Sequence, residues 1–478
     1  AKGCAAGGRR RGGAQARPAA LRARVRAMAA LRGSLRFVIG LCVMRYLGAA
    51  GAPAFERGDP DAELAQRVAR LQARMERDGL DALLLTTEAN VRYTTGYHSP
   101  FWQSPTRPWF VVLPREGEPT AVVPTIGADA FARARVGRVM TWPSPRPSDE
   151  GVGALVEVIS PLCNRTGRVG AELGTEMTLR MPQLDFEALR RRLQALGVEV
   201  VDGSDAIRRS RLVKSPLEVA KVGAACEAMS RAYDILPSVV RAGMTEVQLC
   251  NVVKRLFLEQ GADDAPYVIC RSGPGSYSDI IGHPTGRALQ DGDLLIIDSG
   301  CQVDGYFCDF NRNFAVGQPS PEAAEAFEAV SNATNAALRA VRPGVAVKDV
   351  HRAMAASMGV SLEGGVGRMG HSVGLQLTEW PSIHPDEATV LEEGMLLSIE
   401  PSIDLKSGGG RFVVTEEVVE VTAFGPRLLS SRAPEAIPSL REAGLGKAVI
   451  AEAAAKAAPE RFGECGAGAA ANRTTCDA

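Results

Sequence analysis

Five side chains that can bind metal ions occur in order through the second half of this 478-residue sequence. Four are carboxylates and one is an imidazole, and each lies in or beside a short apolar run; they are Asp298, Asp309, His371, Glu400 and Glu416. A carboxylate within an apolar segment is costly to bury unless it is protonated, paired or bound to a cation. Four such carboxylates and one imidazole suit two divalent cations.

The first two carboxylates lie on neighbouring predicted strands. Asp298 ends the apolar run 294–298, and Asp309 follows 11 residues later. Gly300 and Gly305 permit a tight return between the strands, so the two carboxylates can meet at one end of a hairpin. Either Asp alone could be an ordinary turn residue, but three further candidate ligands follow them in the sequence and favour a metal site.

The other three candidates follow the same pattern. A lone His is commonly a hydrogen-bonded core residue, but the chain has only five, and His371 stands between glycines and between the two carboxylate pairs. Glu400 ends another apolar run. Glu416 and Glu417 are neighbours on a predicted strand, so their side chains face opposite ways and only one of them can line the site.

These ligand types restrict the metal and the chemistry. Mostly carboxylate sites with one imidazole and no thiolate suit Mn²⁺, Fe²⁺, Co²⁺ or Zn²⁺. Two such ions about 3.5 to 4 Å apart would share carboxylates and lower the pKa of a bridging water towards neutrality. The pattern therefore predicts a hydroxide nucleophile at pH 7.

Apolar periodicity predicts two domains that position these residues. Residues 58–206 are predicted to form an α/β domain, with a helix over 64–75 and strands that include 82–85. Residues 207–432 are predicted to form a curved, largely antiparallel sheet backed by helices. The predicted helices of this part are 216–232, 245–259, 321–341 and 347–358, and its strands are 267–270, 294–298, 307–310, 396–400 and 412–421.

The two ends of the chain differ from its body in composition. Residues 1–60 hold 12 Lys and Arg but only two acids, which leaves 43 basic and 53 acidic residues in the remainder and argues against nucleic acid as a partner. The Arg-, Ala- and Gly-rich extension 1–57 predicts an organellar transit sequence. A secretory signal, an anchor and a disordered extension are the alternatives, so a secreted or cytoplasmic location stays open. Residues 433–478 are predicted to be a low-complexity tail.

Ten cysteines are scattered through the chain without a repeating spacing. The chain has no CxxC pair, which disfavours a structural zinc site. Cys270, Cys301 and Cys308 lie in or near apolar runs, so we predict buried free thiols.

The ordered ligand series resembles the creatinase/aminopeptidase P superfamily, the pita-bread metallopeptidases of family M24. The segments that carry the resemblance are 309–314, 370–375 and 394–401, and the likeness extends over roughly 60–430. It implies an α+β architecture, with a pita-bread catalytic domain over 207–432 and a smaller α/β creatinase-like domain over 58–206.

The resemblance also implies a role for each ligand. Asp309 and Glu416 would bridge two divalent ions, with Mn²⁺ favoured, Asp298 would hold one ion, and His371 with Glu400 would hold the other. Glu400 and Glu416 would thereby serve catalysis as well as metal binding. Upstream, His283 corresponds to a substrate-side histidine of the family that would orient substrate or shuttle a proton; the alternative is that His283 caps a turn.

Two positions depart from the peptidase pattern. Peptidases of this family usually have a second His seven residues after the metal His, and here that substrate-side position is Thr378. The family Arg two residues before the last metal Glu is replaced by Val414. Arg411 and His384 are the candidates that could compensate for these losses, whereas His351 is predicted to be a solvated residue on a helix surface.

An aromatic segment of the first domain is a further candidate for substrate binding. Trp102 and Arg107 lie in the segment 97–109, and the resemblance implies that this loop reaches the active site of a neighbouring subunit in a homodimer. An aromatic wall with an Arg suits a small ligand that carries a carboxylate or a quaternary or imino nitrogen. The alternative is that Trp102 and Trp109 only pack between domains.

Three functions stay open. The first is a dinuclear-metal hydrolase resembling Xaa-Pro dipeptidase or aminopeptidase P, which cleaves a C–N bond of a dipeptide or small amide by metal-bound hydroxide. The second is a small-molecule enzyme on the same fold, similar to creatinase, ectoine hydrolase or the dimethylsulfoniopropionate lyase. That lyase shares the pattern of 371–381 but has an extra Asp where this chain has Gly300. The third is a catalytically silent binding protein, which the five retained ligands disfavour.

Overall fold

The computed structural model describes residues 57–360 and 367–440. The predicted extension 1–57 lies outside the described residues except for Arg57, and the predicted tail 433–478 lies outside them from residue 441 on. Within the described ranges, no helix is both long enough and apolar enough to cross a membrane.

The first part of the chain folds around a mixed six-stranded sheet in the order β4-β3-β2-β1-β5-β6. The central strand β1 pairs antiparallel with β2 and parallel with β5, which agrees with the predicted alternation of strands and helices. The strands are β1 (Ala82–Leu85), β2 (Phe110–Pro114), β3 (Thr120–Pro124), β4 (Arg138–Trp142), β5 (Arg168–Ala171) and β6 (Glu199–Asp202).

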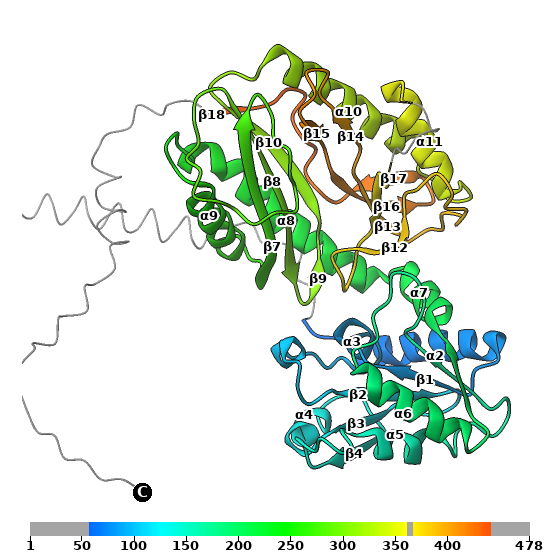
Figure 1. The fold of residues 1–478 in the computed structure, drawn as a ribbon. Coiled ribbons are helices and arrows are strands. Elements are labelled where there is room, and N and C mark those ends of the chain that lie inside the picture. The colour runs from blue at the N-terminus through cyan, green and yellow to red at the C-terminus, as the bar shows by residue number, and fades with distance from the viewer. Residues whose placement is uncertain (1–56, 361–366, 441–478) are drawn as a thin grey trace, which may run out of the picture. The chain divides into compact units, whose positions relative to one another are not determined.

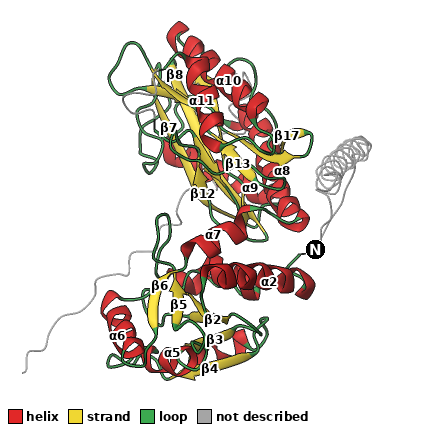
Figure 2. Ribbon diagram, turned by 90° about the vertical axis from the view of Figure 1, so that its right-hand side faces the viewer, coloured by secondary structure: helices red, strands yellow, loops and turns green. Residues whose placement is uncertain are grey.

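Helices cover both faces of this sheet. Leu155 and Leu189 pack with Phe110 in one buried cluster, so α5 and α6 cover one face, and Figure 2 shows α2 on the opposite side of the sheet. The α-helices are α2 (Asp61–Asp78), α3 (Glu88–Thr95), α4 (Ala128–Phe131), α5 (Val152–Ile159) and α6 (Gln183–Gln194), with short 3₁₀ turns η1 (Pro100–Gln103) and η2 (Thr125–Gly127).

Helix α7 (Ser204–Leu212) leads into the second part and spans the predicted domain boundary at 206/207. The next helix, α8 (Pro216–Val239), begins where predicted, because Ser215 accepts from the backbone N–H of Glu218 and Glu218 accepts from that of Ser215. The later helices are α9 (Glu246–Glu259), α10 (Pro321–Ala340) and α11 (Val347–Met358). Figure 1 shows α8 and α9 beside the strands β7 and β8.

The second part contains two five-stranded sheets and a two-stranded ribbon, where the sequence had predicted one curved sheet. The first sheet has the order β18-β10-β8-β7, with β9 paired to β8; the second has the order β12-β11-β13-β16-β17; β14 pairs with β15. The strands of the first sheet are β7 (Asp264–Pro274), β8 (Asp293–Val303), β9 (Tyr306–Phe307), β10 (Phe310–Val316) and β18 (Ser439–Leu440). The others are β11 (Gly370–Ser372), β12 (Glu379–Ser382), β13 (Leu396–Ile399), β14 (Ser402–Asp404), β15 (Phe412–Val414), β16 (Glu417–Thr422) and β17 (Gly425–Leu428).

Direct bonds join the two five-stranded sheets. The hydroxyl of Ser398 on β13 donates to the carbonyl of Asp309 at 2.7 Å, directly before β10 begins. From β10, the Arg312 guanidinium donates to the carbonyl of Glu416 at 3.1 Å and pairs with the Glu417 carboxylate at 3.0 Å. These contacts hold Asp309 and Glu416 beside one another, although 107 residues separate them in sequence.

The structure corrects three local predictions. Asp298 does not end its strand but lies in the middle of β8, because the antiparallel pairing with β7 and β10 continues past it. His351 is buried, not solvated, and one of its ring nitrogens lies 3.2 Å from the carbonyl of Gly367. Part of the predicted tail is ordered: β18 pairs parallel with β10, and the Ala433 N–H donates to Glu417 at 2.7 Å.

The thiol prediction is confirmed for the described residues. All six cysteines in this part of the chain are free, and all except Cys163 are buried. Cys301 and Cys308 lie closest to the ligand series, and their sulfur atoms are 3.5 Å apart.

Candidate metal centre

The predicted ligands converge from both sheets. Asp298 lies in β8 and Asp309 directly before β10, while His371 lies in β11, Glu400 directly after β13 and Glu416 directly before β16. His371 Nε2 is 3.5 Å from Asp309 Oδ2 and 3.9 Å from Glu416 Oε1. One ligand atom from each of these three residues lies within 4.8 Å of the others, which is the spacing that a shared cation requires.

The other two carboxylates act electrostatically on this group of three. Burial, together with the charge of Asp298, raises the pKa of Glu400 to about 8. Burial also raises the pKa of Asp298 to about 6, against the lowering effect of hydrogen bonds with Tyr267 and Glu416. The Tyr267 hydroxyl donates to Asp298 Oδ2 at 3.2 Å. All four carboxylates therefore belong to one electrostatic site.

The two central carboxylates have the strongest need for a compensating charge. Burial, followed by the charges of Asp298 and Glu400, raises the pKa of Asp309 well above its usual range. Burial and the charges of Asp309 and Glu400 do the same for Glu416. Like charges this close cannot all ionise in a buried site unless cations neutralise them.

Polar atoms without protein partners show that the site fits metal ions. Five buried side-chain atoms form no hydrogen bond: Asp298 Oδ1, Asp309 Oδ1, Glu416 Oε2, and both polar atoms of Asn311. Asn311 pairs directly with Asp298 across the sheet, so the two side chains point to the same face. Buried polar groups are rarely left unpaired, and carboxylate oxygens are the expected ligands of divalent cations.

The backbone prepares the imidazole of His371 for this role. His371 Nδ1 lies 2.9 Å from the carbonyl of Ser372, which accepts a hydrogen bond when Nδ1 carries the proton. In that tautomer, Nε2 has no proton, and its lone pair points towards the carboxylates. Burial lowers the pKa of His371 to about 4, and the charge of Arg368 lowers it too. The ring is therefore neutral at pH 7, as a metal ligand must be.

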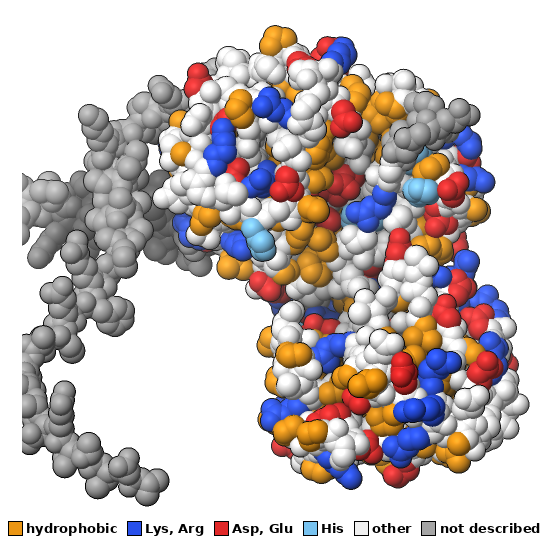
Figure 3. Space-filling view, in the orientation of Figure 1, with side chains coloured by type: hydrophobic (Ala, Val, Ile, Leu, Met, Phe, Trp, Pro, Cys, Tyr) orange, Lys and Arg blue, Asp and Glu red, His pale blue; other side chains and the backbone are white. Residues whose placement is uncertain are grey.

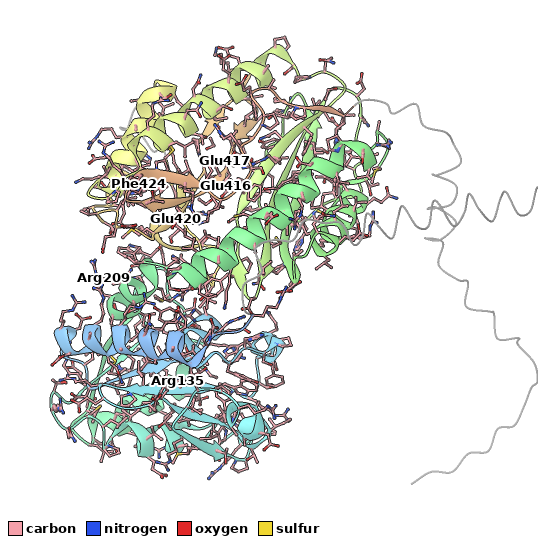
Figure 4. The ribbon with its side chains drawn as sticks, turned by 180° about the vertical axis from the view of Figure 1, so that it is seen from behind. Arg135, Arg209, Glu416, Glu417, Glu420 and Phe424 are labelled. Atoms are coloured by element: carbon pink, nitrogen blue, oxygen red, sulfur yellow. The ribbon has the colours of Figure 1, made fainter. Side chains whose placement is uncertain are left out.

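The neighbours Glu416 and Glu417 lie in the second part of the chain (Figure 4), and their contacts separate as the strand geometry predicts. Glu416 lies beside His371, whereas the fully buried Glu417 pairs with Arg312 and Arg432, each at 3.0 Å. Of this pair, Glu416 is the one whose oxygens lie among the ligands.

The predicted substrate residues occupy different places. Thr378 is exposed on the loop between β11 and β12, where it lines a cavity of about 20 Å³ with Arg208 and Trp380. His283 is exposed on the loop between β7 and β8, and its carbonyl accepts from Arg271 at 3.2 Å. Neither side chain has a contact with the ligands, so their roles in substrate binding stay predictions.

The aromatic segment of the first part packs mainly within its own domain. Trp102 is 7% exposed, and its Nε1 donates to the carbonyl of Thr86 at 3.2 Å. Its ring contacts those of Tyr97 and Trp109 with centroids 5.8 and 5.0 Å away. This burial favours a packing role for Trp102. Arg107 is half-buried at a positive φ of 54°, and its reach towards a neighbouring subunit stays a prediction.

Arg411 and His384 were the candidates to replace the missing polar groups, but the charge that shifts the pKa values of the candidate ligands comes from another residue. Arg411 donates to the carbonyl of Pro274 at 2.9 Å, and His384 lies on the surface near Asp386. Val414 is 1% exposed in an apolar cluster and offers no charge.

Arg368 is the cation that supplies this charge. It is exposed, and its charge lowers the pKa of Asp309, Glu400 and His371. The only sequence signal for Arg368 was its position three residues before His371.

In Figure 3, acidic side chains are visible in a recess on the face of the second part of the chain.

Comparisons with known proteins agree with this geometry. A model described as "Metallopeptidase family M24" matches residues 220–423, and one described as "Creatinase/Prolidase N-terminal domain" matches residues 67–213. The chain is 31% identical to "Probable dipeptidase PepE" of Mycobacterium tuberculosis, over 76% of this chain and 94% of that protein. The chain belongs to metallopeptidase family M24.

Two further proteins resemble the chain over most of its length. "Xaa-Pro dipeptidase" of Pyrococcus horikoshii is 27% identical over 78% of this chain and 99% of that protein. The crystal structure of "Dipeptidase PepE from Mycobacterium ulcerans" superposes with a TM-score of 0.69 and 30% identity, covering 80% of this chain and 100% of that one. The expected pita-bread α+β fold is confirmed, and the protein is a metal-dependent hydrolase.

Proposed function

We propose that this M24 hydrolase is a dipeptidase with two divalent metal ions that cleaves the C–N bond of Xaa-Pro dipeptides. The observation that carries the proposal is the cluster of the buried Asp309, His371 and Glu416, together with the unpaired carboxylate oxygens of Asp298, Asp309 and Glu416. The names of the M24 relatives, dipeptidase and Xaa-Pro dipeptidase, support this substrate class.

Each ligand has a place in this site. Asp309 and Glu416 would lie between both ions, Asp298 would hold one, and His371 with Glu400 would hold the other; Mn²⁺ is the favoured metal. When bound, divalent ions would supply Lewis-acid chemistry, which lowers the pKa of a water molecule and polarises a carbonyl group.

The residues around the ligands orient them and the substrate. Tyr267 holds the Asp298 carboxylate in one orientation through its hydroxyl. Arg368 would supply the positive charge that pairs with a dipeptide carboxylate. Thr378 stands where the peptidase pattern has its second His, and its hydroxyl is too weak an acid to replace that proton donor at pH 7. Trp102 and Arg107 would contribute only if a homodimer brings them to a neighbouring site.

Arg368→Met is expected to raise KM for dipeptides by roughly tenfold or more, with a smaller change in kcat. The reason is that a guanidinium paired with the substrate carboxylate contributes equally before and during the reaction. Steady-state kinetics measure the split. Arg411→Met removes an Arg that binds only the Pro274 carbonyl among the described residues, so this control should keep its KM. A fall in kcat at constant KM in the Arg368 variant would count against the assignment.

Thr378→His is expected to raise the turnover of Xaa-Pro dipeptides by at least about tenfold. An imidazole at this position can donate a proton, and positioned general acids contribute about 10²- to 10⁴-fold. Thr378→Leu is the matched control, because it changes the size of the side chain without adding a donor. A gain in both variants would mean that the size of residue 378, rather than proton donation, limits the reaction.

The substrate class is tested by offering the manganese-loaded protein Xaa-Pro dipeptides, ectoine, creatine and dimethylsulfoniopropionate in parallel. We expect cleavage of the dipeptides. The specific observations that favour the second candidate, a small-molecule enzyme of the same fold, are Thr378 and Val414, which leave the site without two polar groups of the peptidase pattern. Turnover of one of the three small molecules, with none of any dipeptide, would replace the proposed function with that candidate.

A further inference from the structure

Two buried cations lie at the end of helix α7, where the first part of the chain passes into the second: Arg211 in its last turn and Lys214 just after it. Arg211 and Lys214 are 6% and 5% exposed, and both meet the Glu379 carboxylate, which is 8% exposed. Lys214 Nζ lies 3.2 Å from Glu379 Oε2, and Arg211 Nη2 contacts Glu379 Oε1. Burial alone would raise the pKa of Glu379, but Arg211 and Lys214 lower it to about 2, so this carboxylate is ionised throughout the neutral range.

This cluster extends directly to the strand that carries the metal-binding imidazole. Lys214 Nζ donates to the hydroxyl of Ser372 at 2.8 Å. The carbonyl of the same residue lies 2.9 Å from His371 Nδ1. Ser372 therefore stands between a buried ammonium group and the imidazole, and any shift of Ser372 also shifts the acceptor that orients the ring.

The Glu379 carboxylate also supports the loop that separates His371 from Thr378. The backbone N–H of Gln376 lies 3.2 Å from Glu379 Oε1. A Cβ atom added to Gly374 would lie 2.7 Å from the same oxygen, so only glycine lets the loop pass this close. The loop is thereby wrapped around the carboxylate, with the metal-binding strand at one end and the substrate-side position at the other.

On its other side the cluster reaches the first part of the chain. Arg211 Nη1 donates to Asn90 Oδ1 at 2.6 Å, and Asn90 Nδ2 donates to Glu172 Oε1 at 2.6 Å. Glu172 is buried and also accepts from the backbone N–H of Thr86 at 2.8 Å. A continuous polar path therefore runs from the sheet of the first part to the strand of His371.

Stability alone does not account for this arrangement. Buried ion pairs often contribute no more stability than apolar residues of similar volume would, because removing charges from water is costly. Hydrogen-bonded groups behind a metal ligand, in contrast, fix its orientation and commonly change metal affinity by about 10- to 100-fold when removed.

We propose that Lys214 and Glu379, with Arg211, are positioning residues that hold Ser372 and thereby set the orientation of His371 for metal binding. This inference rests on the proposed metal centre. Through the polar path from Glu172 to Ser372, the first part of the chain would then influence how tightly the second part of the same chain binds metal ions.

The test compares two buried lysines. Lys214→Met and Lys221→Met each remove an ammonium group from a junction between the two parts; Lys221 is fully buried and pairs with Asp59 and Asp304 at 2.8 Å each. Both variants should unfold at a lower temperature than the wild type, because each leaves buried carboxylates without their partner. Metal affinity is measured by calorimetric titration of the metal-free protein with Mn²⁺, and the ligand geometry by the visible absorption of bound Co²⁺.

We expect Lys214→Met to weaken metal binding by about 10- to 100-fold and to change the Co²⁺ spectrum, while Lys221→Met binds within about twofold of the wild type. Ser372→Ala, which removes only the hydroxyl acceptor, should weaken binding in the same direction and serves if Lys214→Met does not fold. The inference would be overturned if the Ser372 and Lys214 variants kept the Mn²⁺ affinity and Co²⁺ spectrum of the wild type. It would also be overturned if the Lys221 control lost as much metal affinity as Lys214→Met. Neither result would touch the proposed metal centre. A wild-type protein that binds no Mn²⁺ or Co²⁺ would instead refute the metal centre itself.

Discussion

Asp309→Asn is expected to lower turnover by about a thousandfold or more and to abolish tight binding of at least one metal ion. Asp309 lies beside His371 and, in the proposed site, would help to hold the ions, so the amide removes a charged ligand. Metal content after desalting and kcat for a Xaa-Pro dipeptide measure the two effects. Retention of two tightly bound ions with wild-type turnover would refute the role of Asp309.

The same variant should stabilise the metal-free protein. Burial raises the pKa of all four carboxylates of the cluster, and the charges of neighbouring carboxylates raise those of Asp309, Glu400 and Glu416 as well. Removing one charge relieves the repulsion among these carboxylates, so the metal-free variant should unfold at a higher temperature than the metal-free wild type. A loss of activity together with increased stability cannot result from misfolding.

Glu417→Gln is the matched control for this experiment. Glu417 is buried near the site but pairs with Arg312 and Arg432 instead of facing the ligands. Breaking a buried pair costs about 3 to 5 kcal/mol. This variant should therefore lose stability in both the metal-free and metal-loaded states while it retains its metal content, which is the opposite of the pattern expected for Asp309→Asn.

Metal binding is expected to strengthen steeply as the pH rises from about 6 to 8 and to release protons. The pKa of Glu400 is raised from 4.5 to about 8, and that of Asp298 is raised from 3.8 to about 6. At pH 6 the metal-free site therefore holds protons that a cation must displace. Calorimetric titrations in two buffers of different ionisation enthalpy count the protons released. Binding that is independent of pH over this range would contradict the raised pKa values.

The free energy of unfolding should also depend on pH, and this dependence should differ between the metal-free and the metal-loaded protein. In the metal-free protein, the folded state holds a proton on Glu400 up to a higher pH than the unfolded chain does, so the free energy of unfolding falls as the pH rises from about 4.5 to 8. Added metal binds the ionised carboxylates and reverses this loss. The increase in melting temperature on adding Mn²⁺ should therefore be larger at pH 8 than at pH 6.

The fold could be predicted largely because apolar periodicity is local. Helix α11 was predicted over the residues that it occupies, and α8 and α10 begin where predicted. The strand that carries Asp298 was predicted too short, because its end is set by pairing with β7 and β10 and not by its own residues. The division into two sheets likewise depends on contacts between segments that are far apart in sequence.

The candidate ligands could be singled out from the sequence for a different reason. Carboxylates in apolar runs are rare enough to indicate a site, and four of them with one His, in a fixed order along the chain, carried the resemblance to M24 proteins. Residues that act through tertiary proximity gave no such signal. Lys214 and Glu379 are 165 positions apart, and nothing in the sequence places them together behind His371.

Two histidines show the limits of local patterns. His351 was predicted to be solvated because its helix is amphipathic, but it lies on the buried side of that helix, where burial lowers its pKa. His384 was a candidate to compensate for missing polar groups, yet it lies at the surface, and Arg368 supplies the charge that acts on the ligands.

The central claim, that two divalent ions held by these five residues perform peptide hydrolysis, is tested most directly by titrating the metal-free protein with Mn²⁺ while following both binding and the cleavage of a Xaa-Pro dipeptide. We predict two ions bound per chain and turnover that reaches its maximum only when both sites are filled. Full turnover with one ion bound, or dipeptide cleavage by protein that has been freed of metal, would contradict the claim.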